Sequence, residues 1–212
     1  MAKLIKSFLG YCCAVVLLAA CSSHSGKDDG LEAQAPFVPL SCIAVLPAST
    51  SADVDETISY EKAQTLEQGA AYATEVMQRV LQGKAKVRFV SSDQMMSLVP
   101  DISGGISGTV AALGQKLNCD GVLLTTVRQY RQRQGTDYSV DAPAAVDFSM
   151  VLRHSTDGNI VWSADFREEQ ESVLENLFSF GKAKSRGFKW VTVEYLMEQG
   201  IQDRLRNCPY LQ

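Results

Sequence analysis

The spacing of apolar side chains changes from one part of the chain to the next. Over residues 60–81, apolar residues recur every three to four positions, which predicts an amphipathic helix. Over 144–153, apolar and polar residues alternate, which predicts a strand with one covered face. A short run at 42–47 is apolar and ends at Pro47, which is typical of a strand buried on both faces.

Similar patterns predict the remaining elements. We expect further strands at 87–90, 121–133 and 160–166, and further helices at 92–98, 109–117, 174–180 and 191–205. The resulting order, β-α-β-α-α-β-β-β-α, combines a parallel β-α-β start with an antiparallel three-strand meander. The predicted fold class is therefore α/β (α+β), a single mixed sheet with helices packed on it.

The first 21 residues have the pattern of a bacterial lipoprotein signal. Lys3 and Lys6 precede an apolar run at 8–20, which is shorter than the roughly 20 residues that span a bilayer. The sequence Leu-Ala-Ala-Cys at 18–21 is a lipobox, in which the thiol of Cys21 receives a diacylglycerol before cleavage and the freed amine is then acylated. Two or three acyl chains anchor a protein durably, whereas one does not. A plain signal peptide with a chance cysteine, or an uncleaved anchor, is the alternative.

The residues after Cys21 indicate where the protein is sent. By resemblance to Gram-negative lipoprotein sorting, Ser22 at the position after the lipidated cysteine implies the outer membrane, on its periplasmic face. From Ser22 to about Pro39 the chain is polar and has no apolar period, so we interpret it as a flexible tether in which His24 is solvated. We therefore predict three parts: a signal peptide at 1–20, a lipidated tether at 21–40 and a periplasmic α/β domain at 41–212.

Composition narrows the classes of function. The 212 residues include 20 Lys and Arg against 24 Asp and Glu, a net charge of −4 that becomes −6 once the signal is removed. Nucleic-acid binding depends on neutralising phosphates, so we expect no nucleic-acid partner. The 2 histidines, His24 and His154, leave little material for His-based catalysis or metal binding. We expect no enzyme, no metal and no cofactor.

Half of the six cysteines are used up before the domain folds. These are Cys12, Cys13 and Cys21. Cys42, Cys119 and Cys208 remain in an oxidising compartment, where one disulfide plus one buried thiol fits an odd number. The sequence does not rank the three pairings securely. We favour Cys42 with Cys208, because Cys42 opens the first strand and Cys208 lies in the carboxy-terminal tail, with Cys119 as the buried thiol. Three separate buried thiols are the alternative.

Three stretches resemble a known group of envelope proteins. They are an opening Ile-Ala-Val-Leu-Pro strand at 43–47, a Cys-Asp-Gly-Val-Leu-Leu strand at 119–124 and a hairpin closing on Gly-Asn-Ile-Val-Trp at 158–162. Over about 41–205 the chain resembles the periplasmic domain shared by the amino-terminal part of TolB, the curli secretion protein CsgG and the lipoprotein activator LpoB. The resemblance implies a non-catalytic domain that binds other envelope proteins. We expect no outer-membrane pore, because the charged 135–143 loop and its flanking strands lack a lipid-facing apolar band.

Three further motifs look like sites of chemistry. The glycine-rich stretch at 103–109 lacks the lysine of a phosphate loop, and we interpret it as a flexible loop with Thr109 as a helix N-cap. His154, Ser155 and Asp157 stand on one turn, where side chains do not converge as a catalytic triad requires. An acidic run offers the paired carboxylates of a glycosidase, but it leads from a strand into a helix and favours a solvated face. It consists of Glu168, Glu169, Glu171 and Glu175.

A locally basic segment runs from Gly181 to Trp190 in this acidic chain. Its cationic residues are Lys182, Lys184, Arg186 and Lys189. With the aromatic residues around it, the segment is a candidate site for an acidic partner or for the anionic surface of a glycan or lipid head group. The alternative is a solvated loop whose aromatic side chains pack under the adjacent helices.

These observations predict a non-enzymatic outer-membrane lipoprotein. We expect two partners: outer-membrane lipid, through acylated Cys21, and an unidentified envelope protein. Peptidoglycan-associated proteins are among the candidates for the second partner. The domain would act in the periplasm as an adaptor or assembly factor of a cell-envelope complex, through protein–protein binding. Two alternatives stay open, an enzyme that acts on peptidoglycan and a ring-forming secretion component.

Overall fold

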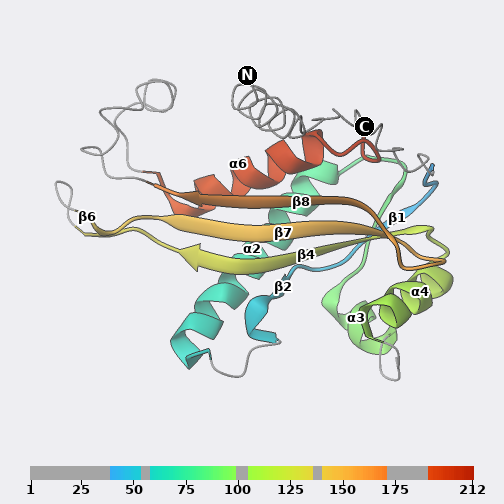
Figure 1. Cartoon of the computed structure of the whole chain (residues 1–212), viewed down its shortest axis with the longest axis horizontal. Helices are drawn as coiled ribbons and strands as arrows, with labels where there is room; N and C mark the ends of the chain where they lie inside the picture. Colours follow the sequence, from blue (N-terminus) through green and yellow to red (C-terminus); the bar gives the residue numbers. More distant parts are fainter. Residues whose placement is uncertain (1–38, 54–57, 99–104, 136–139, 171–190) are drawn as a thin grey trace, which may run out of the picture. The chain divides into compact units, whose positions relative to one another are not determined.

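A computed structural model describes residues 39–53, 58–98, 105–135, 140–170 and 191–212 (Figure 1). Its main sheet has six strands in the order β3-β1-β4-β7-β8, with β2 paired to β4 beside this path. A separate two-stranded sheet pairs β5 with β6. The strands are β1 (Ile43–Val45), β2 (Ser49–Thr50), β3 (Val87–Phe89), β4 (Gly121–Arg131), β5 (Gln134–Gly135), β6 (Val140–Ala142), β7 (Ala145–His154) and β8 (Ile160–Glu169).

The helices of the described residues begin and end at recognisable sequence signals. They are η1 (Ser51–Asp53), α2 (Tyr60–Leu81), α3 (Ser92–Leu98), α4 (Gly105–Leu117) and α6 (Val193–Arg206). After α2 the backbone turns at Gly83, whose φ of +79° lies in the left-handed region that glycine adopts at low cost. At the start of α6 the hydroxyl of Thr192 accepts a hydrogen bond from the amide of Tyr195 at 3.2 Å.

The main sheet is mixed, as the sequence predicts. β1 runs parallel to both of its neighbours, so that Ile43 lies opposite Val87 of β3 and opposite Gly121 of β4. β4, β7 and β8 form the antiparallel meander that crosses Figure 1. All three residues of β1 are buried, which confirms the expectation of a strand covered on both faces.

Helices α2 and α6 cover one face of the sheet and form the larger core. The largest fully buried side chains there come from α2, α6, β1 and the inner positions of β4 and β7: Leu66, Met77, Leu81, Leu196, Met197, Ile201, Ile43, Leu123, Phe148, Met150 and Leu152. Each such side chain contributes about 1.5–3 kcal/mol through burial. The ring of Phe148 stacks on that of Phe166 in β8, with 5.2 Å between centroids.

Two glycines let the helices approach the sheet closely. A Cβ at Gly200 of α6 would lie 2.7 Å from the ring of Phe166, and a Cβ at Gly69 of α2 would lie 2.6 Å from Tyr130 of β4. Both distances are shorter than real Cβ contacts, so any larger residue would push the helix away from the strand.

Among the described residues, the opposite face is covered only in part. A second, smaller core lies between α3, α4 and the short strands β1 and β3, and it extends onto the first residues of β4. Its buried members are Ala44, Leu46, Val90, Val110, Leu113, Cys119 and Val122, with Leu124 packed against them. Beyond Leu124, the residues of β4 on this face include Thr126 and Arg128, and neither belongs to a described hydrophobic cluster.

The predicted fold class is confirmed, with corrections at several boundaries. Helix α4 begins at Gly105, so Thr109 is not an N-cap: it lies one turn inside the helix, where its hydroxyl donates to the Gly105 carbonyl at 3.0 Å. The strand expected over 121–133 ends at Arg131, and the short strands β2, β5 and β6 were not foreseen. The helix expected over 174–180 lies outside the described residues.

Candidate functional site

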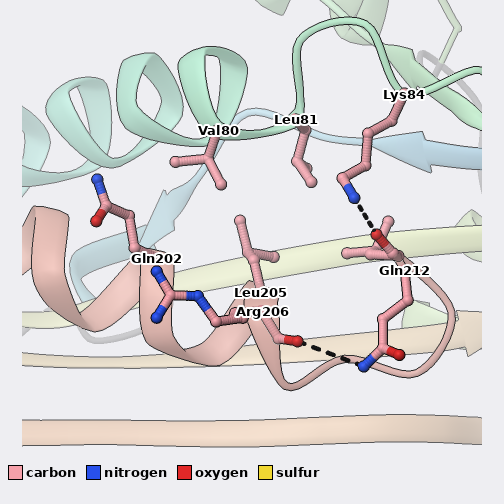
Figure 2. A pocket seen from close by; sticks show the side chains of 8 residues that line it. Val80, Leu81, Lys84, Gln202, Leu205, Arg206 and Gln212 are labelled. Carbon is pink, nitrogen blue, oxygen red and sulfur yellow. Dashed lines mark hydrogen bonds between the residues drawn. The ribbon is translucent and has the colours of Figure 1, made fainter.

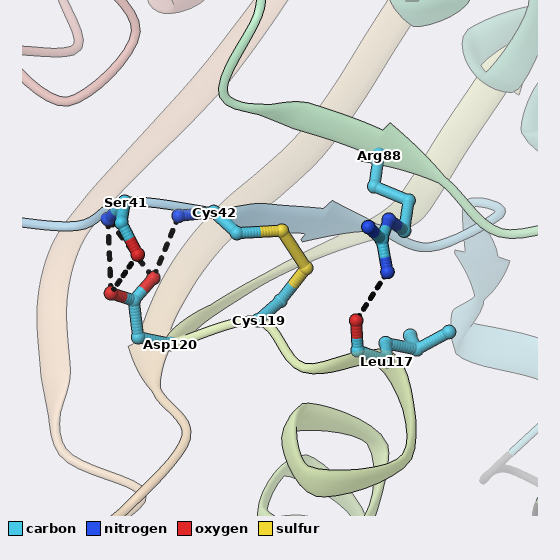
Figure 3. The surroundings of a disulfide bond; sticks show 6 residues. All are labelled: Ser41, Cys42, Arg88, Leu117, Cys119 and Asp120. Atoms are coloured by element: carbon cyan, nitrogen blue, oxygen red, sulfur yellow. Dashed lines mark hydrogen bonds between the residues drawn. A yellow bond between two sulfur atoms is a disulfide. The ribbon is translucent and has the colours of Figure 1, made fainter.

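The disulfide differs from the pairing favoured by the sequence. Cys42 is bonded to Cys119, with Cα atoms 4.6 Å apart, and Cys208 is a buried free thiol (Figure 3). The expected Cys42–Cys208 pair is therefore wrong in this structure, and so is the assignment of Cys119 as the free thiol. The reason is the parallel pairing of β1 with β4, which brings the residues just before the two strands together. Burial raises the pKa of the Cys208 thiol and opposes its ionisation.

A carboxylate secures the same edge of the sheet. Asp120 accepts hydrogen bonds from the amides of Ser41 and Cys42 at 2.8–3.1 Å and from the Ser41 hydroxyl at 2.8 Å (Figure 3). Partial burial opposes ionisation of Asp120, but these donors outweigh it and hold the pKa of the carboxyl below its ordinary value of 3.8. The bonds tie the start of β1 to the start of β4, which is a structural role.

The uncovered part of the sheet carries a ladder of charges across three strands. Arg128 of β4 binds Asp147 of β7 at 2.6 Å and Asp165 of β8 at 2.7 Å. Arg167 of β8 lies 4.0 Å from the other oxygen of Asp147. Arg131 of β4 donates to Glu169 of β8 at 2.5 Å. Arg128 thus bridges two acidic residues on neighbouring strands. Partial burial lowers the pKa of its guanidinium, but the two carboxylates outweigh burial and raise the pKa above its ordinary value.

A row of hydroxyls crosses the sheet beside these charges. The strand register places Ser49 of β2 opposite Thr126 of β4, Thr126 opposite Ser149 of β7, and Ser149 opposite Asp165. The hydroxyls of Ser49 and Thr126 are 3.3 Å apart. We call the outward-facing residues Thr126, Arg128, Asp147, Ser149, Ser163, Asp165 and Arg167 the open sheet face. Its side chains are exposed or half-buried, so it offers a polar surface with fixed positive and negative groups.

A recess of about 420 Å³ lies between the ends of α2 and α6 (Figure 2). It is lined by Val80, Leu81, Lys84, Gln202, Leu205, Arg206, Leu211 and Gln212. The ammonium group of Lys84 donates to the Leu211 carbonyl at 2.5 Å, and the Gln212 amide reaches the Arg206 carbonyl at 3.5 Å. These bonds hold the carboxy-terminal residues against the two helices, so the recess reads as a packing seam.

A polar junction lies where β4 meets the start of α6. Gln132 donates to Glu194 at 3.2 Å, and its amide oxygen accepts from the amide of Val193 at 3.2 Å. Burial raises the pKa of the Tyr130 hydroxyl strongly, and the neighbouring negative charge of Glu194 adds to the rise. The pKa of Glu194 itself is lowered: burial opposes this, but the hydrogen bonds that its carboxylate accepts outweigh it. The junction orders α6.

The residues of the enzyme alternative do not converge in the described part of the chain. His154 contacts Asp157 at 3.1 Å, but Ser155 packs against Gly114 of α4, and its amide bonds to the carbonyl of Asp120. Glu169 is held by Arg131, and both Glu169 and Glu168 lie towards the other end of the sheet, because the register pairs the His154 end of β7 with the start of β8. Glu171 and Glu175 lie outside the described residues.

The residues that the sequence proposes for anchoring and for binding an acidic partner are not among those that the structure describes. Cys21 and the basic segment of Lys182, Lys184, Arg186 and Lys189 fall outside the described ranges. Sequence reasoning predicted that the meander has one covered face, but it did not single out the open sheet face as a candidate site, although charged residues stand at alternate positions in the meander strands. Within the described ranges, the helices are too short or too polar to cross a membrane, and His, Cys, Asp and Glu side chains form no cluster of three or more suited to a metal.

No family model and no curated protein matches the chain. Among solved structures, it is similar to the PelC dodecamer of Paraburkholderia phytofirmans, with 15% identity and a TM-score of 0.44 over 80% of this chain and 89% of that chain. It is similar to the LpoB C-terminal domain of Escherichia coli, with 18% identity and a TM-score of 0.38 over 63% and 86%. The lipoprotein GNA1162 of Neisseria meningitidis gives 16% identity and 0.38 over 70% and 99%. The predicted resemblance to the LpoB group is confirmed in this sense, and at such identities it concerns the fold alone.

Proposed function

We propose that this chain is an outer-membrane lipoprotein that acts in the periplasm as a non-enzymatic adaptor or assembly factor of an envelope complex. Acylated Cys21 holds it in the membrane, and the stretch up to residue 40 serves as the tether. The α/β domain at 41–212 then binds another envelope protein, and peptidoglycan-associated proteins are among the candidates.

The open sheet face carries the protein-binding part of this proposal. Its charged side chains are fixed by one another: Arg128 is held between Asp147 and Asp165. A reaction needs groups that converge on a substrate in a recess. A surface of fixed, mixed charge instead suits docking, because complementary charges steer a partner and select its orientation. The basic segment with Lys182 and Arg186 is proposed as a second contact for an acidic partner.

The anchor is tested by changing the lipidated residue. Cys21→Ala removes the acyl acceptor, so the variant should leave the membrane pellet and appear in the soluble periplasmic fraction. Cys208→Ala is the matched control, because it removes a different cysteine and should sediment with outer membranes. Membrane sedimentation of Cys21→Ala with its signal removed would contradict the anchor.

The binding surface is tested by a bulky residue in the middle of the open sheet face. Ser149→Arg places a long side chain between Thr126 and Asp165 and should reduce recovery of envelope proteins from crosslinked cells. Gln68→Arg, at an exposed position of α2, is the matched control. Equal membrane location and equal melting temperature of both variants separate a binding defect from a folding defect. Unchanged recovery with Ser149→Arg would reject this face as the binding surface.

A further inference from the structure

β8 is a long strand at the end of the main sheet. It has ten residues and pairs only with β7, and no strand among the described residues lies beyond it. The edge strand on the other side, β3, has three residues. Exposed edges present unpaired N–H and C=O groups that can accept another strand, and proteins commonly block them with proline, lysine or a bulge. β8 has no proline and no lysine, and its register shift lies at its beginning, opposite Leu152 and Arg153.

The ladder shows which residues of β8 direct their backbone outward. Ala145 lies opposite Glu169, so Ala144 lies opposite Gln170, and the Gln170 amide donates to the Ala144 carbonyl at 2.9 Å. Hydrogen-bonded and non-bonded pairs alternate along an antiparallel ladder. The even-numbered residues from 162 to 170 therefore bond β7, and the N–H and C=O groups that point away from β7 belong to 163, 165, 167 and 169.

The same residues carry the charges of the outer face. Asp165 and Arg167 are two positions apart, so their side chains project from the same face. Both are exposed: the side chain of Asp165 is 69% accessible and that of Arg167 is 79% accessible. In an antiparallel pair of such strands, the order of these two residues is reversed from one strand to the other. The acidic residue of one copy can therefore face the basic residue of the other.

We propose that two copies of this chain join by antiparallel pairing of their β8 strands, centred on Phe166. In this register Asp165 of each copy lies opposite Arg167 of the other, which gives two equivalent ion pairs, and the outward backbone groups of 165 and 167 hydrogen-bond across the junction. A two-fold axis perpendicular to the sheet relates the copies and continues the open sheet face from one to the other.

Charge selects this register among its neighbours. Centring the pair on Asp165 places the two Asp165 carboxylates opposite each other, and centring it on Arg167 does the same to the two guanidinium groups. Centring it on Ala164 places Arg167 opposite Val161 and leaves no ion pair. Sliding one strand along the other by an odd number of residues is excluded, because residues opposite each other would then project from different faces of the sheet.

Two charge reversals test the pairing. Both variants are made in the full-length lipoprotein solubilised in detergent. In Arg167→Glu, Asp165 of each copy faces a glutamate of the other, so both ion pairs become pairs of like negative charge. In Asp165→Arg, Arg167 of each copy faces an arginine of the other, so both become pairs of like positive charge. Each variant alone should raise the dimer dissociation constant about tenfold or more. A mixture of the two variants restores both ion pairs and should form a dimer of about wild-type affinity. Light scattering over a concentration series measures the mass, and Arg79→Glu on α2 is the matched control, with no change expected.

The mixture also shows that the single variants are folded, since unfolded chains could not restore the dimer. Wild-type protein that stays monomeric at every concentration would overturn the proposal, and so would single variants that dimerise normally or a mixture that does not associate. An assembly larger than two chains supports β8 pairing if Arg167→Glu dissociates it and the mixture restores it, and rejects it otherwise. Self-association is measured without reference to lipid anchoring or envelope partners, so the result is independent of the proposed function.

Discussion

Loss of the Cys42–Cys119 disulfide should destabilise the domain by several kcal/mol. The bond closes a loop between residues 77 positions apart. The loss of loop-closure entropy for that length corresponds to about 4.5 kcal/mol of unfolding free energy. Folded domains are stable by about 5–15 kcal/mol, so this is a large share of the total.

Urea unfolding of the full chain with and without reductant measures the effect. With an m-value of about 2 kcal/mol per molar urea, the midpoint should fall by about 2 M on reduction. Cys119→Ala should unfold at the low midpoint under both conditions. Cys208→Ala should keep the reductant-dependent shift, because its thiol is free.

The opposite behaviour would refute the pairing. If Cys208→Ala abolishes the shift while Cys119→Ala retains it, the chain uses the Cys42–Cys208 bond and the register of β1 on β4 must differ from that described. Peptide mapping under non-reducing conditions provides the direct check, since it should recover one linked peptide pair that contains Cys42 and Cys119.

Three further outcomes are expected. Asp120→Asn should be less stable than wild type at neutral pH, and the difference should fade as pH falls from 3.8 through the lowered pKa of Asp120 in the folded state; urea unfolding from pH 7 downward checks this. Gly200→Ala should cost about 1–3 kcal/mol in urea unfolding because its Cβ would collide with Phe166, whereas a gain in stability, as in an open helix, would contradict the close packing. Neutralising the basic segment should weaken partner recovery, as should high salt, while the free energy of unfolding changes by no more than about 0.5 kcal/mol. Full recovery would show that the segment is only solvated. The four changes are Lys182→Gln, Lys184→Gln, Arg186→Gln and Lys189→Gln.

Elements with a strong period were predicted well. The helix over 60–81 has the expected bounds because its apolar residues keep a helical spacing for its whole length and Gly83 ends it. The start of α4 was placed four residues too late, because Gly105 and Gly108 suggested a loop and Thr109 resembled a cap. Helix packing can hold glycines that propensity alone would exclude.

Contacts between strands required information that no local pattern contains. Cys42 and Cys119 each stand just before a strand, but they meet only because β4 inserts beside β1 and runs parallel to it. The charge ladder depends on register in the same way. Asp147 lies opposite Gln129, and Arg128 reaches it because the register of β4 shifts between Val127 and Gln129.

Strand length and helix length together explain why this domain has an open sheet face. The three strands of the meander have ten or eleven residues, whereas β1 and β3 have three each. On one face, α2 and α6, with 22 and 14 residues, are long enough to cover the meander. On the other face, α3 and α4 pack over the short strands and the first residues of β4. The meander beyond Leu124 must therefore be polar on that side to remain soluble, and ordered charges such as Arg128 and Asp147 satisfy this need. The surface that the helices do not cover is thus also the surface on which a partner would find a fixed pattern of charge.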